Sequence, residues 1–367
     1  MKAISIVTGT ADLRLADRPE PTITAPDEVK LCVLRVGICG TDREEASGGR
    51  ADPPEGSSEL VIGHEMLGQV VETGSSVTRL KAGDYCVFTV RRGCGRCPAC
   101  LMDRADMCSS GQYRERGIKG LDGYETEFVV DREVHAVHLP DALEAVGVLA
   151  EPLSIAEKAI DEAVRVQTAR LSYAQPGPGW LRGKRCLVAG LGPVGLLAAM
   201  ALSLRGAEVY GTDIVGPATA RPVWLEFIGG KYLDGRRVAP DGVQQEVGPM
   251  DFIFEATGVA ALEFNLLDAL GTNGIYVLTG IPGGDRPLQI PGAELIRRLV
   301  LDNQVMLGSV NASRGHFQMA VDDLSAARQS WGDHVNKLIT HRYPPAEFEK
   351  ALKYHDPDEI KGVIEWR

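Results

Sequence analysis

Four of the eight cysteines of this chain lie close together in the segment RRGCGRCPACLMDRADMC (91–108). Their spacing is C-x2-C-x2-C-x7-C, which puts four thiolates on one loop, and four thiolates can close a tetrahedron around Zn2+. A metal held in this way has no open position for a substrate, so we interpret the site as structural. The predicted ligands are Cys94, Cys97, Cys100 and Cys108.

A second set of metal-ligand types is spread over three distant segments, GICGTD (37–42), IGHEMLG (62–68) and LAEPLSIAEKA (149–159). One sulfur, one nitrogen and one or two carboxylate oxygens are typical of a catalytic zinc with room for water or substrate. Spacing alone does not join these residues, because single residues of these types are more often structural. The candidates are Cys39, His64, Glu65 and Glu151.

A glycine-rich turn, GLGPVG (190–195), follows the strand-like run RCLVAG and opens a helical run. Gly190, Gly192 and Gly195 fit the pattern G-x-G-x-x-G, with Pro193 and Val194 between the last two. In this context the glycines allow a tight turn and a close approach of the backbone to a pyrophosphate at the helix N-terminus. The turn therefore predicts a dinucleotide site.

Asp213 ends the next strand-like run, AEVYGTD (207–213). An acidic side chain at this position accepts hydrogen bonds from the ribose hydroxyls and repels a 2′-phosphate. The following residues, 214–220, contain no arginine, and the nearest one is Arg221. We therefore predict NAD rather than NADP as the preferred cofactor.

The pattern of the chain predicts two domains. Residues 1–140 contain short strand-like runs separated by Gly and Pro, which indicates a mostly antiparallel β domain. From residue 185 strands alternate with helices, which is typical of a doubly wound parallel sheet. We expect residues 1–170 and 310–367 to form the catalytic domain and residues 171–309 the NAD-binding domain.

The charge balance narrows the choice of partners. The net charge is −11, with 50 acidic and 39 basic residues, which argues against binding to nucleic acid or to an anionic membrane. No run of 18 apolar residues occurs, and the N-terminus lacks a secretory segment, so we expect a cytoplasmic protein. In a reducing compartment, clustered cysteines favour metal binding over disulfides.

The segment GHEMLGQVVETGSSVTRLKAGDYC (63–86), the four-cysteine lobe and GLGPVG together resemble the zinc-dependent medium-chain dehydrogenase/reductase superfamily. The resemblance implies an α/β chain with a GroES-like, β-rich catalytic domain and a Rossmann domain. It also implies two zinc ions per chain. Cys39, His64 and Glu151 would hold the catalytic ion, with Glu65 a nearby or alternating fourth ligand. Relatives commonly form homodimers or homotetramers through the dinucleotide domain.

Four further segments, 113–118, 151–159, 251–258 and 302–324, resemble the glucose 1-dehydrogenase branch. By position, Glu115 would bind sugar hydroxyls, Asn311 would lie near both nicotinamide and sugar, and Thr257 would contact the cofactor. Glu157 would support its helix. Members of the branch can have polar residues where this chain has Val90 and Ile155, so a related aldose, a deoxysugar or a cyclic polyol are alternative substrates to glucose.

The resemblance implies oxidation of a sugar hydroxyl, for an aldose the C1 hydroxyl to the lactone, with hydride transfer to NAD. Zinc would act as the Lewis acid, and Thr41 either begins a proton relay or only caps a turn. A zinc-independent reductase of the same superfamily is disfavoured by the presence of Cys39, His64 and Glu151. A non-enzymatic sensor that binds NAD and zinc is the remaining alternative.

Overall fold

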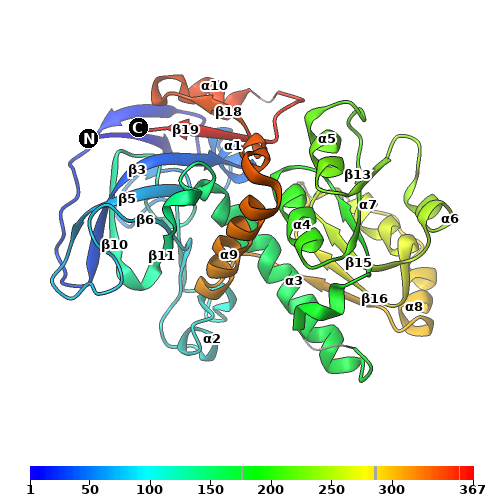
Figure 1. Ribbon diagram of the computed structural model, residues 1–367. Helices are drawn as coiled ribbons and strands as arrows, with labels where there is room; N and C mark the ends of the chain where they lie inside the picture. Colours follow the sequence, from blue (N-terminus) through cyan, green and yellow to red (C-terminus); the bar gives the residue numbers. More distant parts are fainter. Residues whose placement is uncertain (175–176, 285–286, 355) are drawn as a thin grey trace. The chain divides into compact units, whose positions relative to one another are not determined.

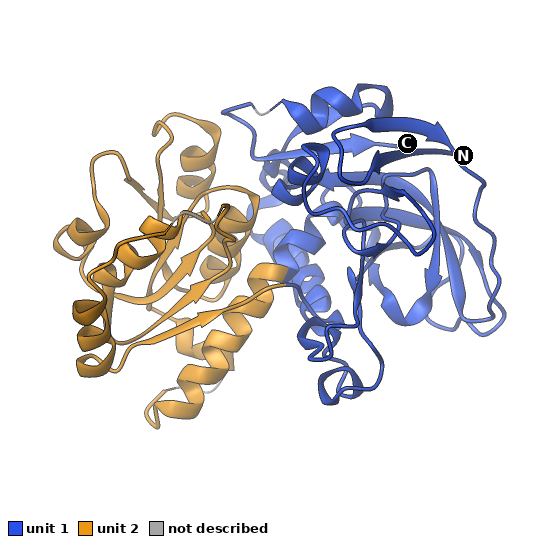
Figure 2. Ribbon diagram, turned by 180° about the vertical axis from the view of Figure 1, so that it is seen from behind, with its two compact units in different colours: residues 1–154, 311–367 blue, residues 155–310 orange. Residues whose placement is uncertain are grey.

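The computed structural model describes residues 1–174, 177–284, 287–354 and 356–367. The described residues form two compact units, residues 1–154 with 311–367, and residues 155–310 (Figure 2). The units divide within helix α3 (Ala150–Arg170), earlier than the expected boundary after residue 170. The expected boundary lies at the end of the helix, which the sequence pattern marks. The boundary between the units lies inside the helix, where the sequence has no such mark.

The first unit is built on mostly antiparallel sheets, although β18 and β19 of the larger sheet pair in parallel (Figure 1). A three-stranded sheet has the order β2-β1-β4, and a seven-stranded sheet has the order β11-β6-β5-β3-β19-β18 with β10 paired to β3. The strands are β1 (Lys2–Val7), β2 (Leu13–Asp17), β3 (Glu28–Ile38), β4 (Glu59–Val61), β5 (Glu65–Thr73), β6 (Tyr85–Phe88), β10 (Phe128–Arg132), β11 (Ala136–Leu139), β18 (Ile339–Tyr343) and β19 (Lys361–Glu365). The helices are α1 (Gly40–Ala46), α9 (Arg314–Trp331) and α10 (Phe348–Lys353).

Strand β3 is the centre of the larger sheet because its run EVKLCVLRVGI is apolar at almost every position. Its partners are antiparallel, and the register places Gly37 opposite Glu65 and Ile38 opposite Gly362. The end of β3, the start of β5 and the start of β19 therefore meet at one edge of the sheet. Residues from three distant parts of the sequence come together there.

The four-cysteine lobe carries a small sheet of its own, with the order β7-β8-β9. Its strands are β7 (Arg91–Arg92), β8 (Arg114–Arg116) and β9 (Gly120–Leu121), and its helix is α2 (Pro98–Leu101). Helix α2 has no buried residue. The lobe therefore has little apolar core to fix the loop between β7 and β8.

The second unit is a six-stranded parallel sheet with the order β14-β13-β12-β15-β16-β17, which confirms the doubly wound fold. The strands are β12 (Arg185–Ala189), β13 (Glu208–Asp213), β14 (Lys231–Asp234), β15 (Met250–Glu255), β16 (Leu270–Leu278) and β17 (Val305–Gly308). The helices are α4 (Pro193–Leu204), α5 (Ala220–Phe227), α6 (Val243–Val247), α7 (Ala260–Asn265) and α8 (Gly292–Leu301). Among the described residues, no helix combines the length and the hydropathy needed to cross a bilayer.

Candidate functional site

Cys39, His64 and Glu65 converge at the sheet edge where β3 ends and β5 begins. One possible ligand atom from each lies within 4.8 Å of the others, and Cys39 Sγ is 3.1 Å from His64 Nε2. The backbone N–H of Thr41 donates to Cys39 Sγ at 3.2 Å, and the N–H of Cys39 donates to the carboxylate of Asp42 at 2.8 Å. These bonds fix Cys39 as the first turn of α1 begins.

Two buried residues that the sequence interpretation missed support this set. Asp42 Oδ1 lies 3.4 Å from His64 Nδ1, which orients the imidazole with Nε2 toward Cys39. Lys361 forms an ion pair with Glu65 and donates to the carbonyl of Ile38 at 2.9 Å. An acidic residue three positions after Cys39 was a visible signal for Asp42, but nothing local links Lys361 to Glu65.

Glu151 is buried at the start of α3, outside the group whose ligand atoms lie within 4.8 Å of one another. Burial, with Glu65 nearby, raises the pKa of the Glu151 carboxyl to about 8. Burial also raises the pKa of the Cys39 thiol. A divalent cation would favour the ionised form of both groups, so the donor set fits a zinc ion held by Cys39, His64 and Glu65, with Glu151 beside them.

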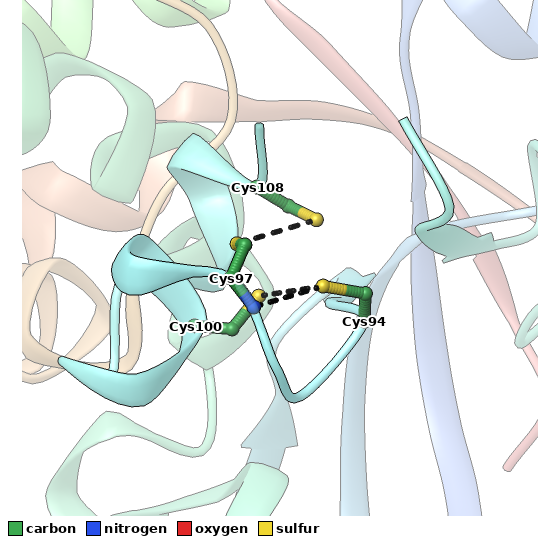
Figure 3. A group of neighbouring side chains, drawn as sticks. All are labelled: Cys94, Cys97, Cys100 and Cys108. Carbon is green, nitrogen blue, oxygen red and sulfur yellow. Dashed lines mark hydrogen bonds between the residues drawn. The ribbon is translucent and has the colours of Figure 1, made fainter. Parts of the chain in front are cut away.

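The sulfurs of the four-cysteine lobe point toward one another (Figure 3). The Cys94 and Cys100 sulfurs are 3.9 Å apart, and those of Cys97 and Cys108 are 4.0 Å apart. Zn–S bonds of about 2.3 Å in a tetrahedron place the sulfurs about 3.8 Å from one another. All four cysteines are free thiols, so the lobe fits a Zn(Cys)4 centre and is not a disulfide knot.

The glycine-rich turn lies between β12 and α4 and lines a cavity of about 440 Å3 in the second unit. Gly190 has φ +88°, and a side chain on Gly195 would overlap the carbonyl oxygen of Gly190, so both positions require glycine. Pro193 and Val194 form the first turn of α4. Gly190, Gly192, Asp213 and Thr257 all line the cavity.

Asp213 ends β13, and its carboxylate is already bonded within the turn. It accepts the N–H of Leu191 at 2.8 Å and that of Ile214 at 2.6 Å. The guanidinium of Arg221 lies 3.6 Å from the same carboxylate and also lines the cavity. The carboxylate of Asp213 thus has a basic neighbour on the cavity wall.

Glu255, at the end of β15, is a further residue that the sequence interpretation missed. It is fully buried and accepts the N–H and the hydroxyl of Thr257, both at 2.5 Å, and the N–H of Gly258 at 3.0 Å. Its second oxygen accepts the N–H of Gly280 at 3.2 Å. One carboxylate therefore joins the loops that follow β15 and β16, next to the cavity.

Glu115 and Asn311, the expected sugar-binding residues, are in direct contact. Asn311 Nδ2 donates to Glu115 Oε1 at 2.7 Å, and its Oδ1 accepts the N–H of Ala312 at 2.9 Å. Asn311 has φ +61°, a conformation that asparagine tolerates better than most residues. Glu157 lies elsewhere, in the second unit, where it forms a buried ion pair with Arg205 at 2.6 Å.

Comparisons with known proteins cover the whole chain. Residues 144–366 match the family model of the glucose dehydrogenase C-terminus, and residues 25–141 match that of the alcohol dehydrogenase GroES-like domain. Glucose 1-dehydrogenase of Methanocella arvoryzae is 36% identical over 369 residues, which cover 100% of this chain and 99% of that protein. Glucose 1-dehydrogenase of Halobacterium salinarum is 37% identical over 358 residues, 96% of each chain.

Comparison with solved structures also finds glucose dehydrogenases. Glucose dehydrogenase of Haloferax mediterranei in complex with NADP, Zn and gluconolactone superimposes with a TM-score of 0.88. It is 32% identical, and the match covers 100% of this chain and 99% of that one. Galactitol-1-phosphate dehydrogenase of Escherichia coli, at 20% identity and a TM-score of 0.81, shares the fold.

Proposed function

This chain belongs to the glucose dehydrogenase branch of the zinc-dependent medium-chain dehydrogenase superfamily, and we propose that it oxidises the C1 hydroxyl of an aldose to the lactone. The C1 hydrogen leaves as hydride to a nicotinamide dinucleotide, and the hydroxyl proton leaves to solvent. The observation that carries the proposal is the convergence of Cys39, His64 and Glu65 at one sheet edge in a chain that matches glucose dehydrogenases over its full length.

A zinc ion held by Cys39, His64 and Glu65, with Glu151 as a further ligand, would supply Lewis-acid polarisation of the substrate hydroxyl. The chain's own buried groups prepare this set. Asp42 holds the His64 imidazole in one orientation, and Lys361 balances the charge of Glu65. Thr41, whose N–H is bonded to Cys39 Sγ, lies two residues after this ligand, and its hydroxyl would accept the substrate proton and pass it to solvent.

Glu115 and Asn311 would bind the sugar. Both side chains are held before any ligand arrives, Glu115 by Asn311 and Asn311 by the backbone of Ala312. A carboxylate and an amide held in this way select for hydroxyl groups, because a substrate without them leaves buried polar atoms unpaired. The proposed substrate class is therefore a polyhydroxylated ring.

We assign cofactor binding to the unit formed by residues 155–310, with NAD preferred over NADP. The support for NAD is Asp213, a carboxylate on the cavity wall where a 2′-phosphate would be repelled. The relative from Haloferax mediterranei was solved with NADP, so the preference rests on the residues of this chain alone. Pro193 and Val194 would contribute the helix N-terminus that faces the pyrophosphate.

A deoxysugar or a cyclic polyol is the second candidate substrate. Val90 is buried beside the lobe, and Ile155 is partly buried in α3; neither can hydrogen-bond a hydroxyl. Where two such positions are apolar, a substrate that lacks the matching hydroxyls is bound without loss of affinity.

We also propose that the chain forms a homodimer or homotetramer through the parallel sheet. Strand β17 is the last strand of that sheet, and helix α8 exposes Ile296, Val300 and Leu301. We also propose a reducing compartment such as the cytoplasm, because the five cysteines proposed as zinc ligands must stay reduced.

The test of the function is a panel of aldoses, deoxysugars and cyclic polyols, each assayed with NAD and with NADP for reduced nicotinamide. The proposal predicts the highest kcat/KM with an aldose or a closely related ring. Absence of reduced cofactor with every sugar would overturn it and would favour the non-enzymatic sensor.

A further inference from the structure

Arg91 connects the four-cysteine lobe to Glu115. Its guanidinium donates to the backbone carbonyl of Asp106 at 2.6 Å, and its Nε donates to Glu115 Oε1 at 3.0 Å. The side chain is 9% exposed, and the guanidinium lies 4.0 Å from the ring centre of Tyr113. A planar fork packed on an aromatic ring holds both acceptors in one fixed geometry, which a lysine cannot do.

The Asp106 carbonyl belongs to the part of the lobe that the cysteines position. Asp106 lies in the short turn Ala105–Met107, between Cys100 and Cys108, and its carboxylate is bonded by Arg104. The large apolar side chains around this turn, Leu101, Met102 and Met107, are exposed, so apolar packing does little to hold the segment. Closure of the four thiolates around a metal would therefore fix the carbonyl that Arg91 contacts.

Glu115 has one oxygen that is occupied and one that is not. Its Oε1 receives Arg91 and the amide of Asn311, whereas within the described part of the chain no group donates a hydrogen bond to Oε2. The residue is only 8% exposed, so Oε2 is a preoriented acceptor at a largely buried position. A sugar hydroxyl is a matching donor, and a bond to a carboxylate is stronger than one to a neutral acceptor.

We propose that Arg91 is a positioning residue through which the folded four-cysteine lobe sets the affinity for the sugar. Arg91 neutralises Glu115 and holds its Oε1, which leaves Oε2 aimed at the substrate, and the lobe in turn holds Arg91 through the Asp106 carbonyl. The proposal rests on the proposed function, because it takes Glu115 as a sugar contact. It gives the structural metal site a role in substrate recognition, although no cysteine of that site touches the sugar.

The first test is Arg91→Lys, with Arg114→Lys as the matched control. Arg114 lies on the neighbouring strand β8 and is exposed. We expect R91K to raise the KM for the sugar roughly tenfold, since a charged hydrogen bond is lost, while the KM for NAD changes less than twofold. Calorimetric titration of the protein with the lactone product, in the presence of NADH, should show the same weakening, and zinc content should stay at the wild-type value.

The second test is a double-mutant cycle with Cys97→Ser, which removes one lobe ligand. If the lobe acts through Arg91, C97S should also raise the sugar KM. The double variant R91K/C97S should then have a sugar KM no higher than that of the more affected single variant. Additive effects would overturn the proposal. If C97S does not fold, Arg91→Met provides a second variant, and an unchanged lactone affinity there overturns the proposal equally.

Glu115→Gln separates this inference from the function on which it rests. A raised sugar KM in E115Q with a normal one in R91K overturns the role of Arg91 and leaves the function intact. A normal sugar KM in both variants removes Glu115 from the sugar site, and with it both the proposed contact and the role of Arg91.

Discussion

His64 Nδ1 lies 3.4 Å from Asp42 Oδ1, and both side chains are almost completely buried. Burial acts to raise the pKa of Asp42, but the neighbouring His64 lowers it overall. Burial likewise acts to lower the pKa of His64, but Cys39 and Asp42 raise it well above its usual value. The imidazole is thus held between the Asp42 carboxylate at Nδ1 and the Cys39 sulfur at Nε2.

We expect Asp42→Asn to weaken zinc binding at this cluster and to lower kcat/KM by roughly 10- to 100-fold, the usual effect of losing the partner of a ligand histidine. Zinc content and activity measured after dialysis against a weak chelator check this. Glu44→Gln, on the same helix but exposed, is the control. An Asp42→Asn protein with normal zinc retention and normal activity would contradict the role given to Asp42.

Asp213→Ser should shift the cofactor preference toward NADP. The substitution removes a negative charge from the cavity wall, where the proposed site would place the 2′-phosphate of NADP, and leaves Arg221 on the same wall. We expect the ratio of kcat/KM for NADP to that for NAD to rise roughly tenfold or more. Asp251→Asn, near the opposite end of a strand in the same sheet, should leave the ratio unchanged. A wild-type ratio in the Asp213→Ser protein would show that Asp213 does not select the cofactor.

Glu255→Gln should weaken cofactor binding without changing the sugar KM. The amide replaces an oxygen that accepts hydrogen bonds from Thr257, Gly258 or Gly280, so at least one buried donor loses its partner. We expect the KM for NAD to rise about tenfold. Glu263→Gln, a buried carboxyl on α7, is the control. If Glu255→Gln and Glu263→Gln lower the melting temperature equally and neither changes the KM for NAD, Glu255 is only structural.

His135 should make the protein less stable as the pH falls. Burial, together with Arg92, lowers the pKa of His135 to about 4, from 6.5 in a model peptide. Between these values the unfolded chain binds a proton that the folded chain does not, so the free energy of unfolding decreases as pH falls through this interval. Urea unfolding at pH 7 and pH 4.5 should show a smaller decrease in His135→Gln than in wild type. The exposed His138 provides the control substitution, and an unchanged decrease in His135→Gln would refute the assignment.

The doubly wound sheet and the four-cysteine lobe could be predicted because their signals are local. The glycines of GLGPVG and the cysteine spacing lie within short segments, and the structure places each set together. Cys39 and His64 were joined only by resemblance to a family, since the register of β3 against β5 brings them together and no spacing encodes it.

The role of Lys361 could not be predicted from the sequence. Lys361 reaches Glu65 because β19 pairs with β3 on the side opposite β5, so the C-terminal segment returns to the first unit. A lysine at the start of an apolar strand gives no sign that its partner lies hundreds of residues earlier. The unit boundary inside α3 was hidden for a similar reason, because a continuous helix carries no mark where its contacts change.

The proposed oxidation transfers hydride from C1 of an aldose to the nicotinamide ring. Glucose or the best aldose of the panel, deuterated at C1, should be incubated with the protein and oxidised cofactor, and the reduced cofactor analysed by mass spectrometry. We expect one deuterium in the reduced nicotinamide and the lactone as the other product. Reduced cofactor without deuterium, or deuterium retained at C1 of all the sugar, would contradict it.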